Sequence, residues 1–188
     1  MENVRHILNR IHPINDEEWD YFKGKFFKRS FPGKTIIIQS GQVESSLYFI
    51  EEGVLRAWFE KDDTEKTFDF AFENNFYSAY SSFLTRTPCS YNIESITGMI
   101  IWEISYNDLQ DIYKNTSVGN IFGKAAAEEL FLSKCKKEFS LLFKSAQQRY
   151  RDLFDEEPRL IREIPLKYIA SYIGITPQAL SRIRRRIS

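Results

Sequence analysis

The segment from Val118 to Phe143 constrains the fold of this chain more than any other. It contains no proline, and its two glycines, Gly119 and Gly123, lie near its start. This predicts one uninterrupted helix of about 39 Å, because its 26 residues rise ~1.5 Å each. On a 3.5-residue period, an apolar seam interrupted only by Glu128 contains Val118, Ile121, Ala125, Leu132, Cys135, Phe139 and Leu142. Further apolar residues widen this face, so we expect the helix to pack on its own chain and on a second copy. A helix packed wholly within one subunit is the alternative.

A different pattern precedes this helix, from Phe31 to about Ser105. Short runs of β-branched and aromatic residues are separated by turn residues such as Pro32-Gly33 and Glu52-Gly53. The runs cover residues 35–39, 47–50, 54–59, 67–70, 91–94 and 99–104. Strands at this spacing predict an antiparallel sandwich or barrel. A hydrophobic interval at residues 75–84 interrupts them, and we expect a short helix or loop there.

The N-terminal residues predict two short helices. The first has an apolar face that ends before Pro13 and consists of Val4, Ile7, Leu8 and Ile11. The second opens at Asn15, whose side chain can accept an early backbone N–H while Glu18 reaches back. Its apolar face consists of Trp19, Phe22 and Phe26.

The few cysteines and histidines limit the chemistry that the chain can perform. Cys89 and Cys135 cannot supply the four thiolates of an iron–sulfur cluster. His6 and His12 both precede the first predicted strand, which leaves no histidine inside the barrel for a metal site or for a catalytic base. We therefore expect neither a metal nor an enzymatic activity.

The hydropathy of the chain and its two cysteines, which fit a reducing cytosol, favour a cytoplasmic protein. A chain of 188 residues accommodates one full domain and a small module. No run approaches the 18 or so consecutive apolar residues of a membrane span, and the N-terminus lacks the apolar core of a signal peptide. We expect no membrane partner.

The formal net charge of zero conceals an uneven distribution. Residues 1–143 contain 16 Lys and Arg against 21 Asp and Glu, a net of −5, whereas residues 144–188 contain 10 against 5, a net of +5. The basic C-terminal part suggests an anionic partner. A solvated basic surface without a partner is the alternative.

The last 25 residues predict two helices joined by a tight turn. Pro165 suits the first turn of one helix, whose apolar side is Leu166, Ile169, Ala170 and Ile173. Gly174 permits the positive φ of a helix-ending turn, and Thr176 with Pro177 predicts the cap and first residue of the next helix. The buried face of that helix would be Leu180, Ile183 and Ile187. Its outer face carries Gln, Ser and Arg side chains, which can bind base edges and phosphates in a DNA groove.

These residues resemble one family. The pattern Ile-Pro-x-Lys-Tyr-Ile-Ala-Ser-Tyr-Ile-Gly-Ile-Thr-Pro, followed by Leu-Ser-Arg-Ile-Arg, is similar to the DNA-binding end of the cyclic-AMP receptor/fumarate–nitrate regulator (Crp/Fnr) family of bacterial transcription factors. Residues 41–56 resemble the β-roll signature of cyclic-nucleotide-binding domains. The order of the predicted elements agrees too, so the resemblance covers nearly the whole chain.

The resemblance implies an α+β fold with three parts. Residues 1–113 would form a double-stranded β-helix (jelly-roll), a cyclic-nucleotide-binding-like effector domain. Residues 114–143 would form the dimerisation helix, and residues 144–188 a helix-turn-helix DNA-binding domain.

The resemblance also assigns roles to the second C-terminal helix. Thr176 would cap it against phosphate, while Gln178 and Arg182 face base edges with Ala179 and Ser181 beside them. Three further residues would mostly bind backbone phosphate: Arg184, Arg185 and Arg186.

The effector domain departs from the family pattern. Members that bind cyclic AMP carry a Gly-Glu pair and then a Pro-Arg-Ser/Ala run, whereas here the first stretch begins Asn75-Phe-Tyr-Ser78 and the second reads Pro88-Cys89-Ser90. Without the arginine the cyclic phosphate would lose a charge-assisted pair, so we expect no cyclic AMP cofactor. Arg86 is a possible substitute. The remaining pocket would be lined by Tyr77, Tyr80, Ser81, Arg86, Cys89 and Ser90, and either an unknown small-molecule effector or simple packing would explain it.

Our leading hypothesis is a homodimeric, sequence-specific transcriptional regulator that binds double-stranded DNA. RNA polymerase and a small-molecule effector are further partners that such a regulator allows. The alternative is an effector-binding β-roll protein that regulates through protein partners without binding DNA.

Overall fold

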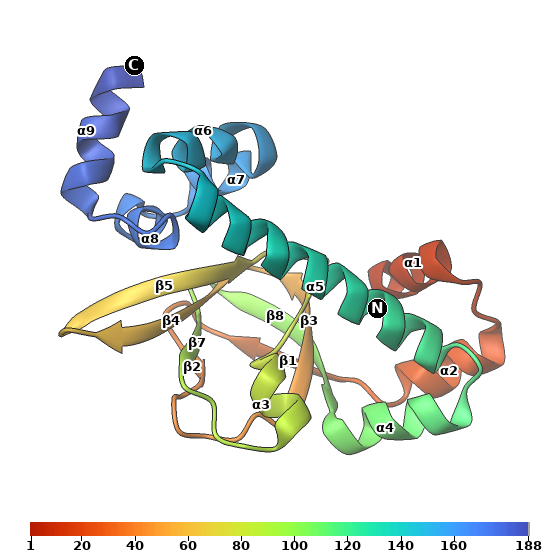
Figure 1. The fold of residues 1–188 in the computed structure, drawn as a ribbon. Coiled ribbons are helices and arrows are strands. Elements are labelled where there is room, and N and C mark those ends of the chain that lie inside the picture. The colour runs from red at the N-terminus through yellow and green to blue at the C-terminus, as the bar shows by residue number, and fades with distance from the viewer. Residues whose placement is uncertain (188) are drawn as a thin grey trace. The chain divides into compact units, whose positions relative to one another are not determined.

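The computed structural model describes residues 1–187, with side chains through Arg186 (Figure 1). The side chain of Ile187 and the whole of Ser188, both in the predicted DNA-binding segment, lie outside the described residues. The helices are α1 (Glu2–Ile11), α2 (Asp16–Lys23), α3 (Tyr80–Thr85), α4 (Tyr106–Asn115), α5 (Gly119–Phe143), α6 (Ala146–Glu156), α7 (Pro158–Glu163), α8 (Leu166–Tyr172) and α9 (Pro177–Ile187). The strands are β1 (Phe27–Phe31), β2 (Ile36–Ile38), β3 (Ser46–Glu52), β4 (Leu55–Lys61), β5 (Thr64–Ala71), β6 (Phe76–Tyr77), β7 (Asn92–Ser95) and β8 (Met99–Ser105).

The strands form two four-stranded sheets. One has the order β1-β8-β3-β6 and the other the order β2-β7-β4-β5. β8 pairs antiparallel with both β1 and β3, and Phe49 of β3 lies opposite Trp102 of β8. The β2–β7 and β3–β6 pairs are also antiparallel. The predicted antiparallel β architecture is therefore confirmed.

Two local expectations needed correction. Residues 75–84 do not form one helix or loop, because β6 occupies their first part and α3 begins at Tyr80. Phe26 lies beyond the end of α2, yet it is buried and its ring lies 5.1 Å from that of Phe22, so it still packs in the expected core. The cap of α2 is as predicted, since Asn15 Oδ1 accepts a hydrogen bond from the Glu18 backbone N–H at 2.8 Å.

The chain divides into two compact units, which we describe separately. Unit 1 comprises residues 1–57 and 70–129, and unit 2 comprises residues 58–69 with the chain from Leu130 onward. The core of unit 1 joins the sheet residues Phe49 and Ile104 to apolar residues of α1, α2 and α4. The predicted domain boundaries at residues 113 and 143 remain a prediction.

Unit 2 has its own buried residues, which come from the helices after α5. They include Tyr150, Leu153, Leu160, Ile164, Ile169, Ala170, Ile173 and Leu180. A capping box starts α6, because Ser145 Oγ accepts from the Gln148 backbone N–H and Gln148 Oε1 accepts from that of Ser145. Within the described part of the chain, every helix is too short or too polar to span a lipid bilayer.

Candidate nucleic-acid interface and effector region

The turn between α8 and α9 has the local geometry that the sequence predicts. Gly174 has φ of +76°, a conformation that residues with a Cβ rarely adopt. The Ile175 backbone N–H donates to the Ala170 carbonyl at 2.9 Å, which closes the end of α8. Thr176 Oγ1 accepts from the Ala179 backbone N–H at 3.2 Å and caps α9. The turn therefore fixes where α9 begins.

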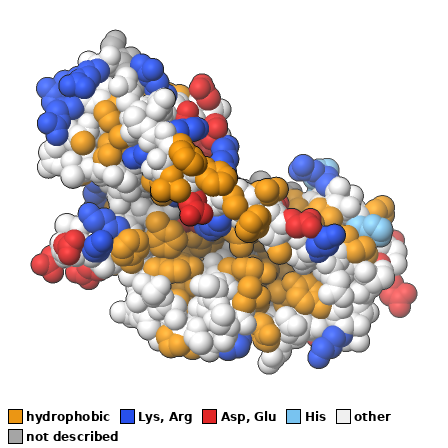
Figure 2. Space-filling model, in the orientation of Figure 1, with side chains coloured by type: hydrophobic (Ala, Val, Ile, Leu, Met, Phe, Trp, Pro, Cys, Tyr) orange, Lys and Arg blue, Asp and Glu red, His pale blue; other side chains and the backbone are white. Residues whose placement is uncertain are grey.

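Helix α9 has one buried side and one strongly basic side. Leu180 is buried, and Ile183 is half-buried on the same side. The predicted DNA-contacting residues are all exposed except the half-buried Ala179: Thr176, Gln178, Ser181, Arg182, Arg184, Arg185 and Arg186. Figure 2 shows Lys and Arg side chains gathered over this helix. Since α9 contains no carboxylate, the polar side chains that it exposes within the described residues are cationic or neutral.

The C-terminal half of α5 exposes large apolar side chains of unit 2. Leu132 is 67% exposed, Phe139 55% and Leu142 68%, and the neighbouring Phe131 and Phe143 are also exposed. Figure 2 shows hydrophobic side chains gathered over this half of the helix. Patches of this kind on soluble proteins usually mark an interaction surface.

The N-terminal residues of the predicted seam are less exposed than the large apolar residues in the second half of α5. Val118 precedes α5 and is buried in the core of unit 1, so it does not belong to an exposed face. Ile121 is 39% exposed, Ala125 is half-buried, and in the second half Cys135 is partly exposed. The exposed part of the predicted 3.5-residue seam therefore does not include Val118, because the core of unit 1 covers that residue.

Arg86, the possible substitute for a phosphate-binding arginine, is engaged within unit 1. It ends α3 with φ of +59°, and its guanidinium donates to the backbone carbonyls of Glu44 at 2.6 Å and Phe83 at 3.3 Å. The same group lies 4.8 Å from the centroid of the Tyr106 ring. These contacts give the guanidinium a structural role in holding α3.

Cys89 stands where the family pattern has arginine, and it is buried. Its Sγ donates to the carbonyls of Gln39 at 3.4 Å and Tyr91 at 3.2 Å. The Cys89 backbone N–H donates to Gln42 O, and its carbonyl accepts from the Gly41 N–H, both at 2.8 Å. The thiol is thus part of a packed backbone junction.

The other predicted pocket residues lie in different surroundings: Tyr77, Tyr80, Ser81 and Ser90. Tyr77 pairs with Tyr48 across strands β6 and β3, whereas the Tyr80 ring stacks on Phe83 at 6.0 Å. Ser81 and Ser90 are exposed.

A buried carboxylate that the sequence did not reveal ties together several backbone segments of unit 1. Glu44 Oε1 accepts from the backbone N–H groups of Ser45 and Ser46 and from the Tyr48 hydroxyl, at 2.8–3.0 Å. Its Oε2 accepts from the Ala79 N–H at 3.5 Å. Burial raises the pKa of Glu44 and outweighs these hydrogen bonds, which lower it.

A second buried charge was also missed. Arg56 Nε donates to Glu94 Oε1 at 2.6 Å, and the side chains are 2% and 13% exposed. A charged residue inside the apolar run at residues 54–59 was the available signal, because a buried charge requires a partner.

Comparisons with known proteins agree with this architecture. Residues 28–116 match the family model of the Cyclic nucleotide-binding domain. No curated protein matches the sequence. A similar solved structure is that of CLP from Xanthomonas campestris, a c-di-GMP responsive global regulator, at 20% identity over 92% of this chain and 91% of that chain, with a TM-score of 0.69.

Two further solved structures are similar. A regulator assigned to the crp/fnr family, from Eubacterium rectale, has 17% identity over 93% of this chain and 83% of that chain, with a TM-score of 0.71. FixK2 from Bradyrhizobium japonicum has 14% identity over 86% of this chain and 84% of that chain, with a TM-score of 0.73. Residues 28–116 thus resemble a cyclic nucleotide-binding domain in sequence, and the fold is shared with solved structures of regulators, one of them assigned to the crp/fnr family.

Proposed function

We propose that this protein is a Crp/Fnr-type transcriptional regulator that binds double-stranded DNA as a homodimer. The observation that carries the proposal is the pairing of a capped, carboxylate-free helix, α9, with the preceding helix α8 through the Gly174 turn. This is the arrangement of a helix-turn-helix, whose second helix enters the major groove.

The exposed side chains of α9 suit both parts of DNA recognition. Arg182 can donate two hydrogen bonds to guanine, and Gln178 can pair with adenine. The arginines at positions 184–186 suit phosphate contacts, which supply affinity without sequence preference. Thr176 lies at the start of the helix, where backbone N–H groups favour an anion.

Dimerisation would bury the apolar face on the second half of α5. Burying several large apolar side chains stabilises an association by ~25 cal/mol per Å² removed from water. Two copies joined there would carry two α9 helices, as recognition of two successive half-sites requires.

In this proposal cyclic AMP is not the effector. Cys89, a buried residue, stands at the position of the phosphate-binding arginine. The Arg86 guanidinium donates its hydrogen bonds to backbone carbonyls instead. A bound cyclic phosphate would therefore lack its cation. Calorimetry with cyclic AMP and cyclic GMP tests this, and micromolar binding of either nucleotide contradicts it.

The decisive experiment is selection of bound duplexes from a random library, followed by anisotropy titration at two salt concentrations. We expect one enriched sequence and an affinity that falls steeply with salt, because each neutralised phosphate releases a counterion. Arg182→Ala should relax one base position of the enriched sequence, whereas Lys114→Ala, which removes an exposed positive charge from α4 in unit 1, should leave the sequence unchanged. No enrichment, with or without added metabolites, contradicts DNA recognition and favours regulation through protein partners.

A further inference from the structure

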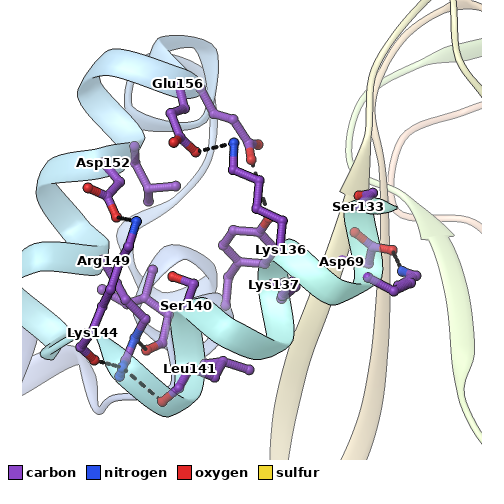
Figure 3. Close-up of a pocket in the computed structure, with 15 residues that line it drawn as sticks. Asp69, Ser133, Lys136, Lys137, Ser140, Leu141, Lys144, Arg149, Asp152 and Glu156 are labelled. Atoms are coloured by element: carbon purple, nitrogen blue, oxygen red, sulfur yellow. Dashed lines mark hydrogen bonds and ion pairs between the residues drawn. The ribbon is translucent and has the colours of Figure 1, made fainter. Parts of the chain in front are cut away.

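Unit 2 contains a cavity of about 260 Å³ between the second half of α5 and α6 (Figure 3). Tyr172 and Ile173, at the end of α8, and Asp69 of β5 complete its lining. Its walls combine charged groups with the apolar side chains of Leu141 and Leu153. The proposed DNA-reading residues of α9 do not belong to this lining.

Most of the charged groups around the cavity already have partners. Lys144 Nζ lies 2.7 Å from Asp152 Oδ2, and Lys136 Nζ lies 2.8 Å from Glu156 Oε2, so both lysines pair with carboxylates of α6 (Figure 3). Arg149 donates its Nε–H to the Ile173 carbonyl at 2.8 Å. The two ion pairs are each neutral overall, so they add no net charge to the cavity.

Among the lysines of the lining, Lys137 alone is half-buried and lacks an ion pair, whereas Lys134, Lys136 and Lys144 are exposed and paired. Its Nζ donates to the Phe68 carbonyl and lies 3.2 Å from the centroid of the Tyr172 ring. Among the described carboxylates none lies within salt-bridge distance of it, and the nearby Asp69 is bound by Lys134 at 2.6 Å. Burial lowers the pKa of Lys137 to about 8, since desolvation disfavours the charged amine.

Glu157 is a further half-buried charged group of the lining. Burial raises the pKa of this carboxyl group, and the Tyr172 hydroxyl donates to it only at 3.5 Å.

We propose that this cavity is a binding site for a small organic anion, a monocarboxylate with an apolar body, whose carboxylate pairs with the Lys137 ammonium. The apolar body would contact Leu141, Leu153 and Ile173. The volume of about 260 Å³ lies just below the range of about 300–1,000 Å³ for pockets that hold drug-sized ligands, which suits an acid as small as benzoate. The ligand would give the half-buried amine an ion-pair partner at salt-bridge distance, which the longer-range attraction of Asp69 and Glu157 does not provide.

Calorimetric titration of the full chain with sodium benzoate and sodium hexanoate tests the proposal, with benzamide as the uncharged analogue. At least one acid should bind with a Kd below about 1 mM, and benzamide should bind at least about tenfold more weakly. Lys137→Met should weaken the acid about tenfold or more, because the paired charge is lost. Lys124→Met, which removes an exposed lysine of α5 outside the cavity, should bind as wild type.

A second variant keeps the test independent of how well Lys137→Met folds. Ser140→Phe places a ring in the cavity from α5 and should abolish binding of the acid with the charge of Lys137 intact. Binding of neither acid, equal binding of benzamide, or unchanged binding by both variants overturns the proposal. None of these readouts involves DNA, so their failure is separate from failure of the proposed function.

Discussion

Thr67 of β5 and Ser171 of α8 form two hydrogen bonds within unit 2. The Thr67 backbone N–H donates to Ser171 Oγ at 2.8 Å, and that hydroxyl lies 3.4 Å from the Thr67 carbonyl, to which it donates. β5 is an edge strand of its sheet, where one side of the backbone has no neighbouring strand. The Ser171 side chain therefore forms hydrogen bonds with one N–H and one carbonyl at this edge, and it joins β5 to α8, the first helix of the proposed helix-turn-helix.

Ser171→Ala should destabilise the contact between β5 and α8. Loss of the hydroxyl removes the acceptor of a buried N–H, which costs about 1–3 kcal/mol. We expect faster hydrogen exchange at Thr67 and a lower midpoint of urea unfolding. Ser181→Ala, at an exposed position on α9, serves as the control and should change neither; unchanged protection of Thr67 in Ser171→Ala would show that the bond is dispensable.

Gly174→Ala should destabilise unit 2 through backbone strain alone. An added Cβ would meet Leu141 and Arg149 at 3.6–3.7 Å, which is ordinary contact, so the cost arises from the positive φ and is about 1–2 kcal/mol. Gly98→Ala is the control, because no heavy atom lies within 4 Å of its added Cβ and its φ is not positive. Thermal unfolding of both variants measures the difference, and an equal effect would contradict the strain argument.

Lys137 predicts a pH dependence of stability at alkaline pH. Burial lowers the pKa of Lys137 to about 8, from the usual 10.5. Repulsion by Lys134 also lowers this pKa, whereas attraction by Asp69 and Glu157 raises it by less than burial lowers it. The unfolded chain therefore binds more protons between these values, and stability from this group rises with pH across that window. Relative to Lys137→Met, wild type should gain about 1–2 kcal/mol of unfolding free energy between about pH 7.5 and about pH 9.5. Urea titrations at both pH values measure it; a constant difference would contradict the burial of a charged amine.

Leu142→Arg should prevent association of two copies. The side chain is 68% exposed in one copy, so the substitution leaves the fold intact but places a charge in the proposed interface. Light scattering should give the mass of one chain for this variant and of two for wild type. Leu84→Arg, at an exposed position of α3, should remain dimeric; a dimeric Leu142→Arg would move the interface elsewhere.

Arg182 and Arg185 should differ in their effects on DNA binding. Arg182→Ala should cost about 1–3 kcal/mol on the selected sequence and relax one base position. Arg185→Ala should weaken binding to all sequences and reduce the salt slope by about 1. Anisotropy on the selected duplex and on its single-base variants separates the two, and identical profiles would contradict the assigned roles.

The sequence predicted those parts of the fold that short-range chemistry determines. The caps of Asn15 and Thr176 and the turn at Gly174 follow from one side chain or one φ value, and each is present. The β6 strand could not be predicted, because its two residues are strand only through pairing with β3. Strand β1 was missed for a related reason: four of its five residues are exposed, so they show no alternation.

The candidate sites divide in the same way. The exposed arginines of α9 are consecutive in sequence and follow one helical pattern, so their placement was predictable. Lys137, Asp69 and Tyr172 come from three separate elements, and only the folded chain brings them around one cavity. Burial of Val118 likewise depends on long-range packing.

The Glu44 carboxylate accepts from four groups, every one of which is a donor. In its isosteric amide the carbonyl oxygen could keep the three bonds of Oε1, but the NH2 group would face the Ala79 N–H, so glutamine would lose that acceptor. Aspartate is a methylene too short to keep the same reach. A change at Glu44 therefore alters the loop before β3 as well, because this one side chain holds the backbone N–H groups of Ser45 and Ser46.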